Sequence, residues 1–231
     1  MSAAPTIRPV DAAGLVLLRG PRDEPEILLG RRHAKAGFLP DIYVVPGGRV
    51  DPEDHLPSGF QEQPHPLVLE NLSRGSNRRP PIAFLRAALR ETHEETGLVV
   101  GRRSSDGAAA AAAPVWRAYA AAGLRPDFAG MDFLLRAITP VGSRRRYNTR
   151  FFLADGGAAA GELRGNGELL DLRWWKASTL DDLNIVDVTQ ALIRLALARW
   201  RARAAIGSEG PKLLLYRKNC LTMRPLAASR A

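Results

Sequence analysis

Apolar residues along this chain gather in short runs separated by turn-forming residues. Residues 10–18 and 26–31 are two such runs, and the stretch between them contains one glycine and two prolines. Aliphatic runs on either side of a turn predict a hairpin of two strands. Residues 42–45 form a third predicted strand, which leads directly to Gly47 and Gly48.

The spacing of the apolar positions changes after the proline pair at residues 80–81. Apolar residues three and four positions apart predict a short amphipathic helix, and Gly97 stands where a left-handed residue commonly ends one. The predicted inward stripe consists of Leu85, Ala88, Leu89 and Thr92.

The later patterns predict more strands and two further helices. We expect strands at residues 98–100, 134–139, 147–153, 169–175 and 213–216. We expect helices within residues 115–123 and 181–203, the second with an inward stripe of Val188, Leu192, Leu195 and Ala196. Residues 108–113 are an alanine-rich spacer.

This order of elements predicts an α+β fold, with a mixed central β-sheet between helices in an α/β/α sandwich. A chain of 231 residues is long enough for one substantial core. We therefore expect a single domain over residues 1–223, with an insertion at about 55–82 and a flexible tail at 224–231.

Three carboxylates lie on one sector of the helix that Gly97 ends. Glu91, Glu94 and Glu95 have the spacing i, i+3 and i+4, at which like charges repel. A divalent cation would relieve that repulsion, and Mg²⁺ commonly rests on a few carboxylates plus phosphate oxygens. A simply solvated acidic face is the alternative, and Arg90 with the upstream glycines favours the metal.

Together these residues resemble the box of the Nudix hydrolase family. That box reads Gly, five residues, Glu, seven residues, then Arg-Glu, an apolar residue, any residue, Glu-Glu, any residue, Gly and an apolar residue. The residues that match it are Gly48, Arg90, Glu91, Glu94, Glu95, Gly97 and Leu98. Asp54 stands where Glu is usual, with Glu53 as an alternative occupant, and Thr92 stands where an aliphatic residue is usual.

The box is interrupted, because 35 residues separate Asp54 from Arg90 where the family pattern has seven. The 28 extra residues resemble the subgroup with a split box that includes the peroxisomal coenzyme A diphosphatases. Each doubling of a loop's length costs only about 0.6 kcal/mol, so a surface insertion can leave the site intact. We expect the insertion, whose apolar run is 67–72, to form a partly ordered lid or rim.

The resemblance implies the Nudix fold and the attack of water on a phosphorus of a nucleoside diphosphate linked to another group. It implies that Mg²⁺, or Mn²⁺ in its place, is held by Gly48, Glu91, Glu94 and Glu95. The candidate catalytic residues are Arg90, Glu91, Glu94, Glu95 and Glu168. In this set the role of Arg90 is to orient a glutamate of the box. Glu168, in a glycine-flanked loop, is a candidate general base, and the alternatives are Glu162, Asp54 and Glu53.

The candidate substrate-binding residues are Arg32, Lys35, Gly47 and Gly48. Coenzyme A hydrolases of the family carry the pattern Leu-Leu, two residues and Arg before Pro-Gly-Gly. In this chain Leu28, Leu29 and Arg32 match that pattern. Gly37 and Asp41 replace the second Arg and the Gly that follow it. Arg32 and Lys35 are either phosphate-binding groups or ordinary charges at a strand end.

Three interpretations follow from the resemblance. The first is a pyrophosphohydrolase of coenzyme A or acyl-coenzyme A, and the second is the same chemistry on ADP-ribose or dinucleotides. The third is a Nudix-fold nucleotide-binding module without turnover, which the three retained glutamates disfavour. Residues that could stack an adenine, or else belong to the core, are Tyr147, Phe152, Trp174 and Trp175.

The net charge of +9 favours an anionic partner. The basic residues are dispersed without interleaved aromatics, so we expect a small phosphate compound rather than nucleic acid. Cys220 is the only cysteine, which excludes an intrachain disulfide and a cysteine-rich zinc site. The sequence has neither an 18-residue apolar run nor a signal pattern, so we expect a cytoplasmic protein without a membrane partner; a homodimer stays open.

Overall fold

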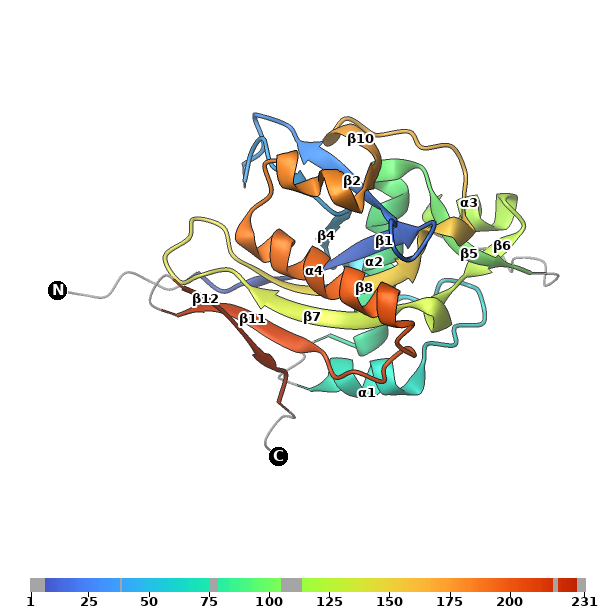
Figure 1. The fold of residues 1–231 in the computed structure, drawn as a ribbon. Helices are drawn as coiled ribbons and strands as arrows, with labels where there is room; N and C mark the ends of the chain where they lie inside the picture. Colours follow the sequence, from blue (N-terminus) through green and yellow to red (C-terminus); the bar gives the residue numbers. More distant parts are fainter. Residues whose placement is uncertain (1–6, 38, 75–78, 105–113, 218–219, 228–231) are drawn as a thin grey trace.

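A computed structural model describes residues 7–37, 39–74, 79–104, 114–217 and 220–227 (Figure 1). The alanine-rich spacer expected at residues 108–113 lies outside this part of the chain. None of the described helices is long and apolar enough to cross a membrane.

The centre of the fold is a mixed β-sheet whose main path runs β10-β2-β1-β8-β7-β11-β12. Strand β1 pairs with β8 in parallel and with β2 in an antiparallel hairpin, as the two aliphatic runs predicted. The strands on this path are β1 Val10–Arg19, β2 Glu26–Arg32, β7 Asp132–Ile138, β8 Tyr147–Asp155, β10 Leu169–Lys176, β11 Lys212–Arg217 and β12 Cys220–Pro225. This mixed sheet confirms the predicted α+β class.

Two short strands attach the glycine segment to the middle of this sheet. Strand β3, Tyr43–Val44, pairs with β2, and strand β4, Gly47–Arg49, pairs with β1 in an antiparallel register. In that register Gly47 lies opposite Gly14 of β1. The Gly-Gly segment is therefore held against the central strand rather than in a free loop.

Helices cover both faces of the sheet (Figure 1). Helix α2, Pro81–Thr96, packs on one face, and its predicted stripe, which includes Leu85 and Leu89, is fully buried there. Helix α4, Asp187–Ala202, packs on the other face through Leu192 and Ala196. Gly97 ends α2 in the left-handed conformation that the sequence predicted.

The helix expected within residues 181–203 is confirmed as α4. Residues Ala177–Asp182 form a 3-10 helix, and the chain is extended at Leu183 and Val186, so α4 begins only at Asp187. Asn184 in this connection donates a hydrogen bond to the carbonyl of Asp41 over 3.0 Å, which holds the segment against the loop after β2.

A second, small sheet lies beside α2. It has the order β6-β5-β9 and is accompanied by helix α3. These elements are β5 Val99–Arg103, α3 Pro114–Ala121, β6 Leu124–Pro126 and β9 Ala159–Ala160. Tyr119 of α3 is buried, and its hydroxyl bonds the backbone of Val100, which joins the helix to the small sheet.

The insertion between the two halves of the box packs into the core, which differs from the lid expected from its length. Its apolar run forms helix α1, Pro66–Ser73, whose Val68 and Leu72 are buried in the same hydrophobic cluster as α2. Helix α1 contacts α2 and β7 (Figure 1). The ends of the insertion meet, because Arg79 Nη1 lies 2.6 Å from His55 Nε2.

The expected boundary at residue 223 falls inside a strand. Arg224 and Pro225 pair with β11 as part of β12, and Leu226 is buried in the core cluster. The Leu226 amide donates to the carbonyl of Pro211 over 2.9 Å. The main-chain ladder and this buried side chain extend the domain by at least three residues beyond the predicted end.

Candidate active site

The two glycines after β3 form a corner into which side chains of α2 reach. A Cβ at Gly47 would overlap the backbone of Ala13 and Gly14 in β1, and a Cβ at Gly48 would overlap the carboxylate of Glu91. Only glycine lets the corner approach both β1 and the acidic helix so closely.

Glu95 and Glu91 are the two carboxylates that face this corner. The amide of Gly47 donates a hydrogen bond to Glu95 Oε2 over 2.8 Å, and Glu91 lies against Gly48. Burial raises the pKa of Glu95 to about 8, and burial likewise raises the pKa of Glu91 to about 7. Both groups therefore lack the solvation that a free carboxylate would have, and a nearby cation would stabilise their charged forms.

Arg90 is buried, and its guanidinium group joins the two halves of the box. Its Nε and Nη2 donate to the two carboxylate oxygens of Asp54 over 3.0 and 2.9 Å. Its Nη1 donates to Glu91 Oε1 over 3.0 Å and to Glu94 Oε2 over 2.9 Å, and Nη2 also reaches the carbonyl of Arg49. Arg90 thus fixes where two box glutamates lie, which fits the orienting role that the sequence suggested.

The structure distinguishes the two acids that could open the box. Asp54 is 2% exposed and holds Arg90 through both oxygens, whereas the Glu53 side chain is 46% exposed and its Oε1 lies 3.7 Å from Arg90 Nε. Asp54 and not Glu53 is therefore the acid that holds Arg90 closely. Because both of its oxygens already bond Arg90, Asp54 is poorly placed to act as a general base.

Glu94 lies differently from its two neighbours. Its side chain is 47% exposed and turns to Arg90 instead of the glycine corner. Within the described part of the chain, no three acidic, histidine or cysteine side chains converge on one point as a preformed metal site. The expected patch of three carboxylates is thus met in part, by Glu91 and Glu95.

Two residues from the sheet edge complete the surroundings of Glu95. Glu168 precedes β10, and its neighbour Leu169 pairs with Arg32 of β2. After burial, which is the largest cause, the charge of Glu168 helps to raise the pKa of Glu95 and that of Arg32 opposes the rise. The fold therefore brings both predicted residues within electrostatic reach of the acidic helix.

The other sequence candidates lie at the surface. Glu162 has a side chain that is 76% exposed and pairs with Arg164 over 2.5 Å. Lys35 is exposed in the turn after β2, and only its backbone amide has a described bond, to His33 Nδ1. Neither residue has a described contact with the glycine corner.

Arg145 is a residue that sequence reasoning missed. Its guanidinium occupies the space beside Gly37 that a Cβ at that position would enter. Gly37 is the position at which the coenzyme A pattern has its second arginine, so an arginine from the β7–β8 connection stands at this place in the loop. The run of three arginines at 144–146 is visible in the sequence, but only the folded structure places Arg145 beside Gly37.

Three of the four aromatic candidates pack against the core. Phe152 is fully buried and packs against Phe133 with ring centroids 5.5 Å apart, so it belongs to the core. Trp174 lies under Arg19, and Trp175 meets Tyr43 edge-on at 5.4 Å. The two tryptophans are half-buried and pack against different core clusters on opposite faces of β10, so they do not form one base-stacking surface.

The donors at the corner suit a hard divalent cation. The carboxylates of Glu91 and Glu95 bring oxygen atoms to the corner, and Mg²⁺ prefers oxygen ligands. The burial that disfavours the two negative charges supports the same conclusion. The residues present therefore fit the metal that the box implies.

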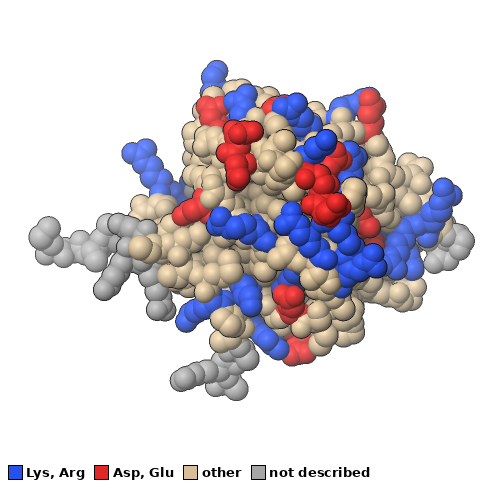
Figure 2. Space-filling view, viewed as in Figure 1, with Lys and Arg blue, Asp and Glu red and all other residues tan. Residues whose placement is uncertain are grey.

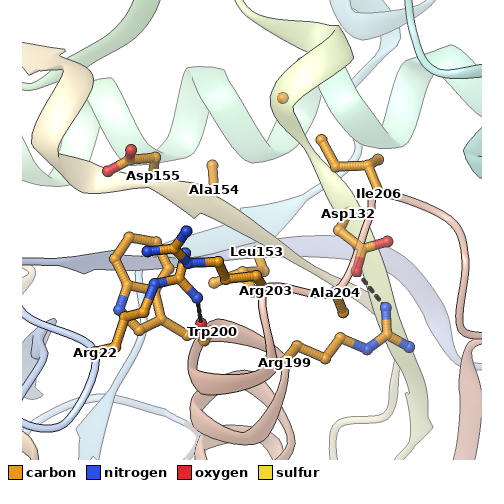
Figure 3. Close-up of a pocket in the computed structure, with 11 residues that line it drawn as sticks. Arg22, Asp132, Leu153, Ala154, Asp155, Arg199, Trp200, Arg203, Ala204 and Ile206 are labelled. Atoms are coloured by element: carbon orange, nitrogen blue, oxygen red, sulfur yellow. Dashed lines mark hydrogen bonds and ion pairs between the residues drawn. The ribbon is translucent and has the colours of Figure 1, made fainter.

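A cavity of about 250 Å³ lies elsewhere, where the end of α4 meets β7 and β8 (Figure 3). None of the box residues lines it. Arg22 donates to the carbonyl of Trp200 over 2.7 Å, and Arg199 pairs with Asp132, so these cations have structural partners.

Figure 2 shows basic and acidic side chains intermixed over one face of the molecule.

No family model and no curated protein matches the chain. Among solved structures, the chain is similar to a Nudix hydrolase from Alicyclobacillus acidocaldarius, with 26% identity, a TM-score of 0.61, and coverage of 85% of this chain and 94% of that one. It is also similar to a MutT protein from Bacillus halodurans, with 12% identity, a TM-score of 0.50, and coverage of 93% and 97%. These two similarities show that the chain has the fold of Nudix hydrolases.

Proposed function

We propose that the protein hydrolyses the pyrophosphate of a nucleoside diphosphate linked to another group, with a divalent metal ion. The observation that carries the proposal is a pair of carboxylates packed against the Gly47-Gly48 corner, the buried Glu95 and the Glu91 side chain, which is 14% exposed. Buried carboxylates without matching cations are costly unless they serve a ligand or a metal. The Arg90 guanidinium bonds Glu91 and so neutralises only part of the negative charge of the two carboxylates.

The metal would be held by Glu91 and Glu95, with the carbonyl of Gly48 as a further oxygen donor; Glu94, which turns to Arg90 in this structure, would add an oxygen after rotating its side chain. Mg²⁺ fits this set, and Mn²⁺ is the alternative ion. When bound, the metal would neutralise charge on phosphate oxygens and lower the pKa of a bound water. Arg90 keeps Glu91 and Glu94 oriented, because its Nη1 bonds both carboxylates.

Glu168 is the proposed general base. It lies on an exposed turn close enough to Glu95 for its charge to act on that group's pKa, and its backbone amide bonds Asn166 Oδ1 over 2.9 Å. An exposed carboxylate beside the acidic corner can accept a proton from an attacking water without first leaving an ion pair. Asp54 cannot do this while it holds Arg90.

Coenzyme A or an acyl-coenzyme A is the proposed substrate. Arg32 is the last residue of β2, Lys35 lies in the turn that follows, and Arg145 adds its guanidinium beside Gly37 in the same connection. Three cations on or beside one connection would suit a substrate with a phosphate besides its pyrophosphate. ADP-ribose and dinucleotides remain the alternative substrates for the same chemistry.

A panel of substrates with Mg²⁺, separated by chromatography, tests the proposal. Coenzyme A should give 3′,5′-ADP and phosphopantetheine, whereas ADP-ribose would give AMP and ribose phosphate. The Glu95→Gln variant should lose turnover, and Glu70→Gln, an exposed change in the insertion, should keep it. Absence of turnover on every compound, with nucleotide binding retained, would favour the non-catalytic interpretation instead.

A further inference from the structure

The insertion is tied to the acidic helix by a buried ion pair. Glu62 accepts a hydrogen bond from Arg86 Nε at Oε1 over 2.8 Å, and its Oε2 pairs with Arg86 Nη2. The two side chains are only 13% and 6% exposed. Glu62 Oε1 also accepts the amide of Ser58 over 2.9 Å, so the pair fixes a turn of the insertion against α2.

The same arginine reaches the first half of the box. Arg86 Nη1 donates to the backbone carbonyl of Asp54 over 3.0 Å, in a buried position. The Asp54 side chain in turn holds Arg90, and Arg90 holds Glu91 and Glu94. A continuous set of buried polar contacts therefore connects Glu62, in the insertion, with the carboxylates of the candidate site.

The contact to the Asp54 backbone addresses a particular difficulty of this sequence. Aspartate is shorter than the glutamate usual at this place by one carbon–carbon bond, about 1.5 Å. The backbone at residue 54 must lie closer to α2 if the carboxylate is to reach Arg90. Arg86 holds the carbonyl of residue 54 at that helix, and Glu62 fixes the position and charge of Arg86.

We propose that Glu62 is a positioning residue for the hydrolytic site, which acts through Arg86 to hold Asp54 against Arg90. The inference rests on the proposed function of that site. The insertion thus supplies a part that the shortened acid at position 54 requires. Outer contacts of this kind commonly change metal affinity or activity by about 10- to 100-fold when they are removed.

The first test compares Glu62→Gln with Glu70→Gln, a control on α1 whose side chain is 61% exposed. For Glu62→Gln we expect kcat to fall about tenfold and half-maximal activation to need more Mg²⁺, with KM for the substrate little changed. The Arg90 Nε–H resonance, which reports on its bond to Asp54, should shift in Glu62→Gln and stay in place in Glu70→Gln. Unchanged kcat and an unchanged resonance would overturn the proposal.

A second comparison separates positioning from folding. In the double variant Glu62→Met with Arg86→Met, an apolar pair replaces the ions, so the thermal midpoint should stay near that of the wild type. Its kcat should nevertheless remain about tenfold below that of the wild type, because the bond from Arg86 to the Asp54 carbonyl is lost. Recovery of both kcat and the thermal midpoint in this double variant would show that Glu62 serves stability alone.

The third comparison adds Asp54→Glu to that double variant. The longer side chain should reach Arg90 from a backbone that is no longer held, and most of the lost kcat should return. A triple variant that is stable but does not regain kcat would contradict the idea that Arg86 and Glu62 compensate for the shorter acid at position 54. The Arg90 resonance and Mg²⁺ affinity can be measured without turnover, so these results stay interpretable if the proposed hydrolysis itself is not observed.

Discussion

Glu95 accepts the backbone amide of Gly47 over 2.8 Å, although the two residues are 48 positions apart in the chain. This bond joins the acidic helix to the strand corner across the whole insertion. The register of Gly47 on β1 and its bond to Glu95 fix this junction directly, whatever the length of the segment between them.

Replacing Gly48 by Ala should disable the site. The added Cβ would overlap the carboxylate of Glu91, and a displacement of about 1 Å can lower catalysis about 100-fold. Steady-state kinetics with Mg²⁺ would measure the loss. Gly210→Ala is the matched control, because no atom lies within 4 Å of a Cβ there, and it should keep full activity. Normal turnover of Gly48→Ala would mean that Glu91 is not needed at the corner.

The stability of the metal-free protein should fall as the pH rises. The pKa values of Glu91 and Glu95 are raised from 4.5 to about 7 and about 8 in the folded state, mainly by burial. Between about pH 5 and pH 8 the folded state then binds more protons than the unfolded state, so stability decreases through that range. A tenfold difference in proton affinity is worth about 1.4 kcal/mol.

Urea unfolding in EDTA at several pH values would measure this dependence. Mg²⁺ should remove most of it, because the ion favours the charged carboxylates, and Glu95→Gln should flatten the curve without metal. A metal-free protein whose stability is constant or increases from pH 5 to pH 8 would contradict the assigned burial of these groups.

Removing Arg90 should destabilise the fold as well as the site. Arg90→Ala leaves the buried carboxylate of Asp54 without its partner, a change that typically costs 3–5 kcal/mol. Arg74→Ala breaks the exposed pair with Glu70 and should cost about 0.5 kcal/mol or less. Chemical denaturation compares the two, and equal losses would argue against a buried role for Arg90.

Glu168→Gln should lower kcat by about 100-fold or more if Glu168 removes the proton from the attacking water. The acidic limb of the pH–rate profile should change with it. Glu162→Gln, in the same connection to β10 and paired with Arg164 at the surface, is the matched control. Equal kinetics for both variants would leave the base to be sought elsewhere.

Arg145→Ala should weaken substrate binding more than the chemical step. The lost guanidinium beside Gly37 should raise KM for coenzyme A about tenfold and leave KM for 3′-dephosphocoenzyme A nearly unchanged. Arg144→Ala removes an exposed neighbour of the same charge and serves as control. Equal effects on the two substrates would show that Arg145 does not read the additional phosphate.

Local patterns in the sequence predicted the elements around the site. The stripe that includes Leu85 and Leu89 gave α2, and Gly97 gave its end, because helical spacing and the left-handed stop depend on nearby residues alone. The aliphatic runs of β1 and β2 were also recognisable as a hairpin. The helix within residues 181–203 was likewise recognisable, and the structure places its start at Asp187, after an extended backbone at Leu183 and Val186.

The sequence by itself determined which residue types the candidate site contains and that a corner and a helix carry them. The tertiary structure decided which glutamates face the corner, that Asp54 rather than Glu53 holds Arg90, and that Arg145 stands beside Gly37. It also decided that the insertion packs in the core and braces α2 through Glu62. These outcomes depend on the directions of side chains brought together from distant segments, and no local pattern records those directions.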